Sequence, residues 1–162
     1  MTEEEFVQAV ERYGDTIYRV AYSCLKNRAD AEDVMQDTLL KLYRERRSFE
    51  SEEHRRRWLI RVAVNQAKSL LRSSWFRRTI PLDEQLDQPV FDRPEESELF
   101  EQVMALPKNY RLALYLYYYE GYQVREVAEL MRANLSTVQT WLMRARGLLQ
   151  QSYKEAWSRD ES

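Results

Sequence analysis

Residues 124–146 read VREVAELMRANLSTVQTWLMRAR, a short apolar-periodic segment, a polar break and a longer apolar-periodic segment. On both sides of the break the apolar residues recur at spacings of three and four, which is typical of one helix face. The pattern predicts a helix from Val124 to about Met131, a tight turn, and a second helix opened by Ser136. The residues expected to form its internal contacts are Val127, Ala128, Met131, Val138 and Leu142. This order is typical of a helix-turn-helix, although an unrelated helical hairpin has the same pattern.

The second of these helices carries mostly polar side chains on its outward face. Gln139, Thr140, Met143 and Arg144 fall on that face within its first turns. In a helix-turn-helix this is the part of the recognition helix that meets base edges in the major groove. The pattern therefore indicates contact with duplex DNA.

Charge is strongly sorted along the chain, although the net charge is only −2. Residues 54–82 hold eight basic side chains and no acidic one, whereas residues 1–53 hold 13 acidic and eight basic ones. Residues 83–105 hold eight acidic side chains and one basic one. The acidic average excludes a uniformly basic nucleic-acid coat, and the cationic block becomes the candidate for phosphate contact.

Within the cationic block, one side of a predicted helix repeats charged and amide side chains at helical spacing. The other side carries Trp58, Leu59, Val62, Ala63, Ala67 and Leu70, which are expected to point inward. The outer side consists of Arg57, Arg61, Asn65, Lys68 and Arg72. A cationic ladder with one carboxamide suits a phosphate track with one base-edge reader. The alternative is an ordinary solvated face, but such faces usually mix charges of both signs.

Two further helices are predicted near the start of the chain, over residues 4–26 and from Asp30 to about Arg46. Asp30 is the expected N-cap of the second, with Asp33 three residues later. Its inner stripe is Ala31, Val34, Thr38 and Leu42, which leaves an outer face rich in carboxylates and amides.

Residues 77–97 hold three prolines, many carboxylates and no sustained apolar period. They predict a linker. We therefore expect an all-α protein with two small helical domains, residues 1–76 and 98–156, joined by an acidic linker over residues 77–97.

Several classes of protein are disfavoured by the residues present. Cys24 is the single cysteine, so an internal disulfide is impossible, and no apolar run is long enough for a signal or a membrane span. We expect a cytoplasmic protein without membrane insertion. Asp30, Glu32, Asp33 and Asp37 could hold Mg²⁺, but Glu32 points about a quarter turn away from the other face and no Gly-rich phosphate loop accompanies them. We expect no enzyme: no catalytic residue, no metal and no cofactor.

Two pairs of stretches resemble the sigma factors of bacterial RNA polymerase, specifically the extracytoplasmic-function (ECF) group. The first pair is DAEDVMQDTLLKLYR and RRRWLIRVAVNQAKSLLR, at residues 30–44 and 55–72. The second is ALPKNYRLALYLYYYEGYQVREVAELM and STVQTWLMRAR, at residues 105–131 and 136–146. They match regions 2 and 4 of the family in order and spacing. The resemblance implies promoter-specific transcription initiation with core RNA polymerase and promoter DNA as partners, and an anti-sigma factor as a further candidate partner.

The resemblance also implies roles for particular residues. Contact with the clamp helices of the largest polymerase subunit falls on Asp33, Gln36 and Asp37. Recognition of the minus-ten element falls on Arg57, Arg61, Asn65 and Lys68. Recognition of the minus-thirty-five element falls on Ser136, Thr137, Gln139, Thr140, Met143 and Arg144. The rings of Phe49 and Trp58 either stack on an unpaired base or belong to the core.

The C-terminal segment departs from the family pattern at four positions. Arg132 and Ser136 stand where the family usually has glycine, and Gln139 and Trp141 where it has basic residues. A non-glycine residue at a turn position with positive φ carries strain. Fewer cations weaken the phosphate contribution to binding. A stand-alone helix-turn-helix regulator is the alternative function, with the N-terminal half as an effector or dimerisation domain.

Overall fold

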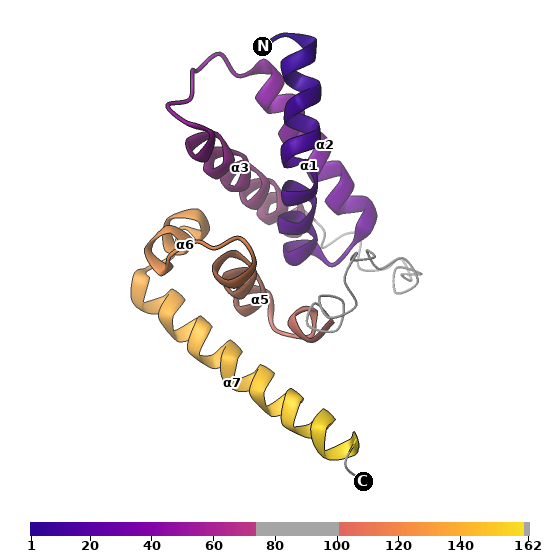
Figure 1. Ribbon diagram of the computed structural model, residues 1–162, viewed down its shortest axis with the longest axis vertical. Helices are drawn as coiled ribbons and strands as arrows, with labels where there is room; N and C mark the ends of the chain where they lie inside the picture. The colour runs from indigo at the N-terminus through magenta and orange to yellow at the C-terminus, as the bar shows by residue number, and fades with distance from the viewer. Residues whose placement is uncertain (74–100, 161–162) are drawn as a thin grey trace. The chain divides into compact units, whose positions relative to one another are not determined.

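The computed structural model describes residues 1–73 and 101–160, with side chains up to residue 151. The chain splits into two compact units, one at each end, and every regular element in the described ranges is helical (Figure 1). This confirms the predicted all-α class. The predicted linker at residues 77–97, and with it both domain boundaries that border it, lies outside the described residues.

The first unit is a bundle of three helices, α1 (Glu3–Leu25), α2 (Arg28–Arg44) and α3 (Glu52–Ser73), each packed against the other two. Its core is made of large apolar side chains with less than 2% exposure. These are Ile17, Val20, Leu42, Leu59, Ile60 and Val64. Full burial of one such side chain contributes roughly 1.5–3 kcal/mol, so the seam between the three helices holds this unit together.

The junction between α1 and α2 corrects one sequence prediction. Lys26 ends α1 in the left-handed region, with φ 52°, and Asn27 is the N-cap of α2. Asn27 has an extended backbone, and its side chain accepts a hydrogen bond from the Asp30 N–H at 3.0 Å. The expected N-cap, Asp30, therefore lies inside the helix. Asparagine is as good an N-cap as aspartate, so the residue type alone could not choose between them.

The buried face of α3 is also rotated from the predicted one. Leu59, Ala63 and Ala67 are buried as expected, but Ile60 and Val64 are completely buried while Val62 and Leu70 are only half-buried. Because α3 packs against both α1 and α2, its buried face is wider than a single stripe and turned toward Ile60.

The second unit begins with helical residues 101–104 and continues with α5 (Lys108–Leu114), which runs into a π-helical turn, η3 (Tyr115–Tyr119). Gly121, at φ 78°, breaks the chain before α6 (Val124–Met131), and α7 (Leu135–Asp160) follows. The five residues predicted to form the internal contacts of the helix-turn-helix, Val127, Ala128, Met131, Val138 and Leu142, are all buried. The predicted order of a short helix, a tight turn and a longer helix is confirmed, with α7 starting one residue early.

Arg132, in the turn between α6 and α7, has the positive φ that the sequence suggested. Its φ is 53° and its ψ 48°, and its N–H donates to the carbonyls of Ala128 and Glu129. The side chain is exposed. A left-handed conformation in a residue with a Cβ costs on the order of 1 kcal/mol.

We expect Arg132→Gly to raise the free energy of unfolding by about 1 kcal/mol, because glycine removes that strain. Denaturant unfolding of the full chain measures it. The matched control is Arg144→Gly at an exposed position in the interior of α7, which should lower stability by about the same amount because glycine disfavours helix interiors. Equal losses in both variants would contradict the strain at Arg132.

Candidate nucleic-acid and protein interfaces

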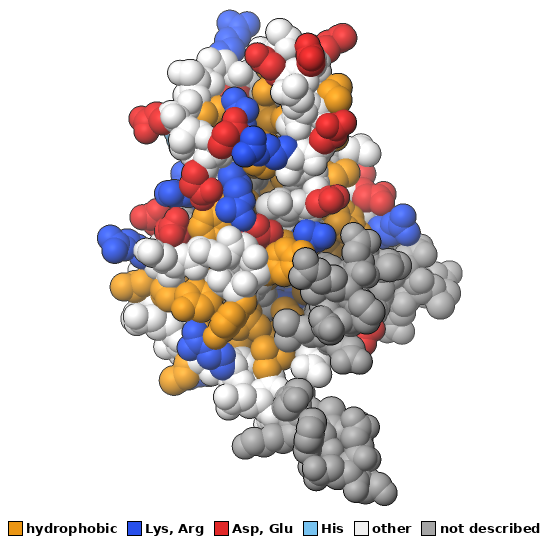
Figure 2. Space-filling model, in the orientation of Figure 1, with side chains coloured by type: hydrophobic (Ala, Val, Ile, Leu, Met, Phe, Trp, Pro, Cys, Tyr) orange, Lys and Arg blue, Asp and Glu red, His pale blue; other side chains and the backbone are white. Residues whose placement is uncertain are grey.

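The outer face of α3 carries the four residues predicted to contact the minus-ten element. Arg61 is exposed, and Arg57, Asn65 and Lys68 are half-buried. Over the first unit, basic and acidic side chains lie beside one another on the face shown in Figure 2. The structure therefore places all four on one helix without making that helix uniformly cationic.

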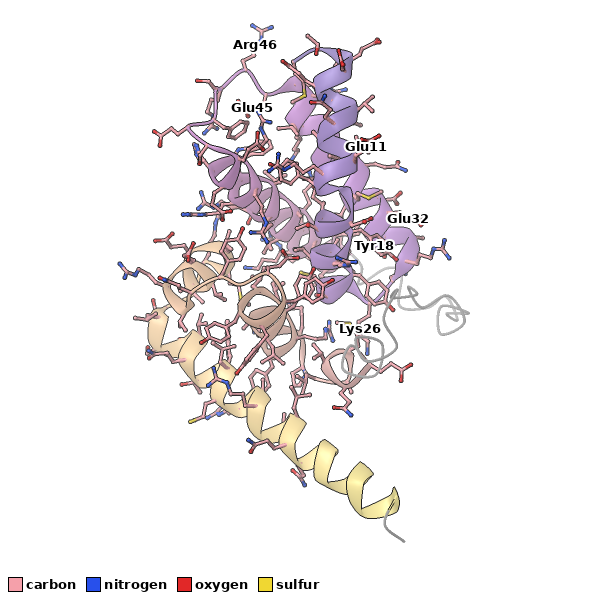
Figure 3. The ribbon with its side chains drawn as sticks, viewed as in Figure 1. Glu11, Tyr18, Lys26, Glu32, Glu45 and Arg46 are labelled. Carbon is pink, nitrogen blue, oxygen red and sulfur yellow. The ribbon has the colours of Figure 1, made fainter. Side chains whose placement is uncertain are left out.

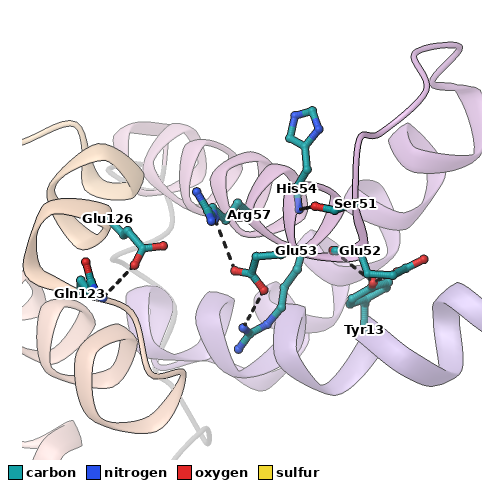
Figure 4. A network of polar contacts seen from close by, with 9 residues as sticks. Tyr13, Ser51, Glu52, Glu53, His54, Arg57, Gln123 and Glu126 are labelled. Carbon is teal, nitrogen blue, oxygen red and sulfur yellow. Dashed lines mark hydrogen bonds and ion pairs between the residues drawn. The ribbon is translucent and has the colours of Figure 1, made fainter.

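The first arginines of the cationic block are paired with carboxylates that immediately precede it. Arg55 lies 3.4 Å from Glu52, and Arg56 lies 3.5 Å from Glu53. Arg57 lies 3.4 Å from Glu53 (Figure 4). The sequence prediction counted no acid among residues 54–82, but Glu52 and Glu53 sit one helical turn before these arginines. Such exposed pairs contribute only about 0.3–0.5 kcal/mol, so a phosphate can displace them, but Arg57 is a weaker candidate than Arg61.

Glu52 joins the start of α3 to α1. The Tyr13 hydroxyl donates to the Glu52 carboxylate (Figure 4). Arg12 and Arg55 lie 3.8 and 3.4 Å from the same carboxylate. Burial, together with this hydrogen bond and the charge of Glu52, raises the pKa of Tyr13 to about 12. The same hydrogen bond lowers the pKa of Glu52. These contacts fix the end of α3 from which the preceding loop emerges.

We expect Tyr13→Phe to lower the free energy of unfolding by about 1–2 kcal/mol near neutral pH, because a hydrogen bond to a charged acceptor is lost. The lowered pKa of Glu52 means that its stabilisation is lost as the pH falls through that pKa. The raised pKa of Tyr13 means that its stabilisation is lost as the pH rises from 10 to about 12.

The measurement is the unfolding free energy of both proteins across pH. Their difference should be largest between these two limits and shrink toward each of them. Tyr43→Phe, at an exposed tyrosine of α2, is the control and should change little. A Tyr13→Phe difference that is constant at all pH values would show that the hydroxyl is not bonded to the carboxylate.

The loop before α3 carries a basic groove with an aromatic ring. Phe49 lies edge-on to Trp58 and His54, with ring centroids 5.5 and 5.4 Å away, and the Arg55 guanidinium is 5.4 Å from its centroid. The Glu50 N–H donates to His54 Nδ1 at 3.2 Å, which closes the loop onto the helix. Phe49 and Trp58 are both half-buried. Neither ring is a fully enclosed core residue, so each retains surface that a base could contact.

Three arginines of this groove were not singled out from the sequence. Arg44, Arg46 and Arg47 line it together with Phe49 and Arg55. Figure 3 shows Arg46 pointing away from the bundle. The signal that could have found them is the run RERR at residues 44–47, placed directly before the aromatic loop.

A second groove lies between α2 and α3. The three residues predicted to contact polymerase, Asp33, Gln36 and Asp37, are exposed and all line it. Leu40, which is 44% exposed, and Lys41 continue the α2 wall, and Gln66, Ser69 and Ser73 form part of the α3 wall. The structure thus brings the predicted trio together and adds an exposed leucine that no sequence pattern distinguished from its buried neighbour Leu39.

On the second unit, α7 exposes most of the residues predicted to contact the minus-thirty-five element. Ser136, Gln139, Met143 and Arg144 are exposed, and Thr137 and Thr140 are half-buried. The Thr140 hydroxyl donates to the Ser136 carbonyl of its own helix at 3.0 Å. The next cation along the helix, Arg146, is held by Tyr118, whose hydroxyl lies 2.6 Å from its Nε.

The described residues contain no group of three or more His, Cys, Asp or Glu side chains placed to hold a metal ion. Among the helices described, none is both long and apolar enough to cross a membrane. Cys24 is buried in the first unit.

Comparison with known families matches both units. Residues 9–77 match the model of sigma-70 region 2, and residues 97–149 match that of sigma-70 region 4, so the two together cover about three quarters of the chain. Relatives include RNA polymerase sigma factor SigV of Bacillus subtilis, 27% identical over 91% of this chain and 90% of the relative. ECF RNA polymerase sigma factor SigM of Mycobacterium tuberculosis is 29% identical over 89% of this chain and 74% of the relative. The chain belongs to the sigma-70 family, in its ECF group.

Solved structures share the fold of this ECF sigma factor. The sigma factor RpoE, in complex with the anti-sigma factor NepR from Bartonella quintana, matches with a TM-score of 0.76 and 22% identity, over 93% of this chain and 98% of that one. CnrH, in complex with the cytosolic domain of CnrY, matches with a TM-score of 0.63 and 22% identity, over 95% and 90% of the two chains. A region 2 match at the N-terminal unit disfavours a stand-alone helix-turn-helix regulator, because that unit is then not an effector domain.

Proposed function

We propose that this ECF sigma factor divides promoter-specific transcription initiation among three surfaces. The groove between α2 and α3 binds the clamp helices of the largest subunit of core RNA polymerase, through Asp33, Gln36 and Asp37. The outer face of α3 and the basic loop before it bind the minus-ten element, and the exposed face of α7 binds the minus-thirty-five element.

The observation that carries this proposal is that one small bundle presents two surfaces of different chemistry. The groove between α2 and α3 combines two carboxylates and two cations with amides and the exposed Leu40, which suits a protein surface that carries charges of both signs and a small apolar area. The loop groove combines Arg44, Arg46 and Arg47 with the ring of Phe49, which suits single-stranded nucleic acid because bases stack on rings and phosphates pair with cations.

The minus-thirty-five assignment rests on the helix-turn-helix of the second unit. Its turn is closed by the buried Val127, Met131 and Val138, which leaves the first turns of α7 exposed. This is the arrangement by which such motifs place a helix in the major groove.

Site-specific photo-crosslinking in the holoenzyme–promoter complex tests the division. A crosslinking residue is placed in turn at positions 36, 61 and 143, with position 8, exposed on α1, as the control. We expect crosslinks to the largest polymerase subunit from position 36, to minus-ten DNA from position 61 and to minus-thirty-five DNA from position 143. Position 36 crosslinking to promoter DNA, or position 61 crosslinking only to protein, would overturn the assignment.

An anti-sigma factor is proposed as a further partner, because RpoE, a sigma factor of this fold, is found in complex with the anti-sigma factor NepR. We also propose that the chain acts in the cytoplasm, where core polymerase is found, and that it has no enzymatic activity of its own. Its contribution is then to position polymerase and promoter, while polymerase carries out the chemistry.

A further inference from the structure

One stripe of α7 points directly away from the core of its unit. Val138, Leu142 and Ala145 are almost completely buried on the inner side of the helix. On the opposite side, Ser136, Gln139 and Met143 recur at spacings of three and four, and all three are exposed. Met143 is 63% exposed, more than any other large apolar side chain in the described part of the chain. A helix that holds a methionine this far out presents an apolar contact to whatever it binds.

Two cations of this region lie off that stripe, and the third is bound by tyrosines. Arg144 follows Met143 by one residue, which turns it about 100° around the helix. Arg146 donates from Nε to the Tyr118 hydroxyl, and its guanidinium carbon lies 5.6 and 5.5 Å from the ring centroids of Tyr117 and Tyr118. Arg132 sits in the turn before α7. Arg146, three residues after Met143, is the one arginine in the described part of α7 that shares the stripe of Gln139 and Met143, and these contacts hold its guanidinium against the two tyrosines.

The chemistry of Gln139 and Met143 matches A·T base pairs. Arginine is the commonest reader of guanine, through O6 and N7 in the major groove. Glutamine instead pairs with N6 and N7 of adenine, and apolar side chains contact the C5-methyl group of thymine. Thr140, between them, has its hydroxyl bonded to its own helix and is half-buried.

The spacing limits how far apart the two base pairs can be. Residues four apart on a helix have Cβ atoms about 5–6 Å apart, and successive base pairs rise by about 3.4 Å. Gly147, one turn beyond Met143, carries no side chain, and a Cβ built there would have nothing within 4 Å. Gln139 and Met143 thus span one or two base-pair steps.

We infer that α7, if it binds the minus-thirty-five duplex as proposed above, reads neighbouring A·T pairs there, adenine through Gln139 and a thymine methyl group through Met143. This makes the two residues determinants of promoter specificity. It also explains the departure from the basic residue that the family usually has at position 139, since a carboxamide reads adenine and a guanidinium reads guanine.

The first experiment selects promoters with holoenzyme formed from core polymerase and the full chain. The library has a fixed minus-ten element and a randomised minus-thirty-five element. We expect A·T at two base pairs that are adjacent or one step apart. Gln139→Ala should reduce discrimination at one of them by roughly 5- to 150-fold, the range of one bidentate base contact. Gln150→Ala, at an exposed glutamine of the same helix, is the control and should retain the wild-type preference.

The second experiment tests the two contacts atom by atom on the selected promoter. Replacing the thymine by uracil removes the methyl group and should weaken wild-type binding about three- to fourfold, but should leave Met143→Ala unaffected. Replacing the adenine by 7-deazaadenine removes N7 and should weaken the wild type but not Gln139→Ala. Both variants change exposed side chains, so their folding is expected to be unchanged.

Selection of G·C at these positions, or no preference at all, would overturn the inference. So would variants that remain as sensitive to uracil and 7-deazaadenine as the wild type. In each of these outcomes, the proposed function would still stand if transcription from promoters with the fixed minus-ten element depended on the chain. Loss of that transcription as well would count against the proposed function itself.

Discussion

The double substitution Gln36→Ala and Asp37→Ala is expected to lower the affinity for core RNA polymerase by roughly a hundredfold to a thousandfold. Both side chains are exposed on α2 and line the groove that α3 closes on its other side. When a partner fills such a groove, buried polar contacts are the ones whose truncation costs most, often about 2 kcal/mol or more each. Neither residue contributes to the core of the bundle, so the unfolding free energy should change by less than about 0.5 kcal/mol.

Glu32→Ala is the matched control for this variant. It removes one carboxylate from the same helix, as Asp37→Ala does, but Glu32 pairs with Arg28 at 3.2 Å and does not line the groove. Co-purification with core polymerase should be retained by Glu32→Ala and lost by the double variant. If both variants still co-purified with core polymerase, the groove between α2 and α3 would not be the polymerase contact.

The second large expected effect is on the salt dependence of promoter binding. Each phosphate neutralised by a side chain contributes about 0.7–0.9 to the slope of log affinity against log salt concentration. Arg61→Ala and Lys68→Ala, tested with holoenzyme on a promoter, should each lower the slope by about one, and the double variant by about two. Arg57→Ala should have a smaller effect, because binding of Arg57 to a phosphate first releases its pair with Glu53.

Asn65→Ala should behave differently from these cations. It should reduce discrimination within the minus-ten element by about 1–3 kcal/mol, with little change in the salt slope, because a carboxamide reads a base edge. Arg144→Ala tests the competing assignment, in which α7 carries most of the DNA affinity. Loss of binding and slope in Arg144→Ala, with Arg61→Ala and Lys68→Ala unchanged, would mean that α3 is not the main DNA surface.

Local patterns predicted the second unit well. Each side chain expected inside the helix-turn-helix is buried. This could be predicted because the spacing of apolar residues in a helix and the residue types of a turn are both local features of the sequence. The strain at Arg132 was equally visible, since only the residue type at a turn position was needed to see it.

What the sequence could not supply depends on contacts between distant or competing groups. The buried face of α3 is rotated toward Ile60 and Val64 because two helices pack against α3 at the same time. The hydrogen bond from Tyr13 to Glu52 joins residues 39 positions apart in the sequence. The cationic block looked free of acids because Glu52 and Glu53 lie just before it in sequence, although they pair with its first arginines, one helical turn later. At the candidate site, the exposed face of α2 could be predicted from periodicity, but not the α3 wall that makes it a groove.

Run-off transcription tests initiation by this chain most directly. Core RNA polymerase is supplied with a template that carries a promoter selected by the holoenzyme, with and without the chain, and with the Gln36→Ala, Asp37→Ala double variant. We predict a transcript of defined length only when the wild-type chain is present, and little or none with the double variant. Tight binding of the chain alone to the promoter, with no transcript dependent on it, would contradict its role as a sigma factor and indicate a stand-alone regulator.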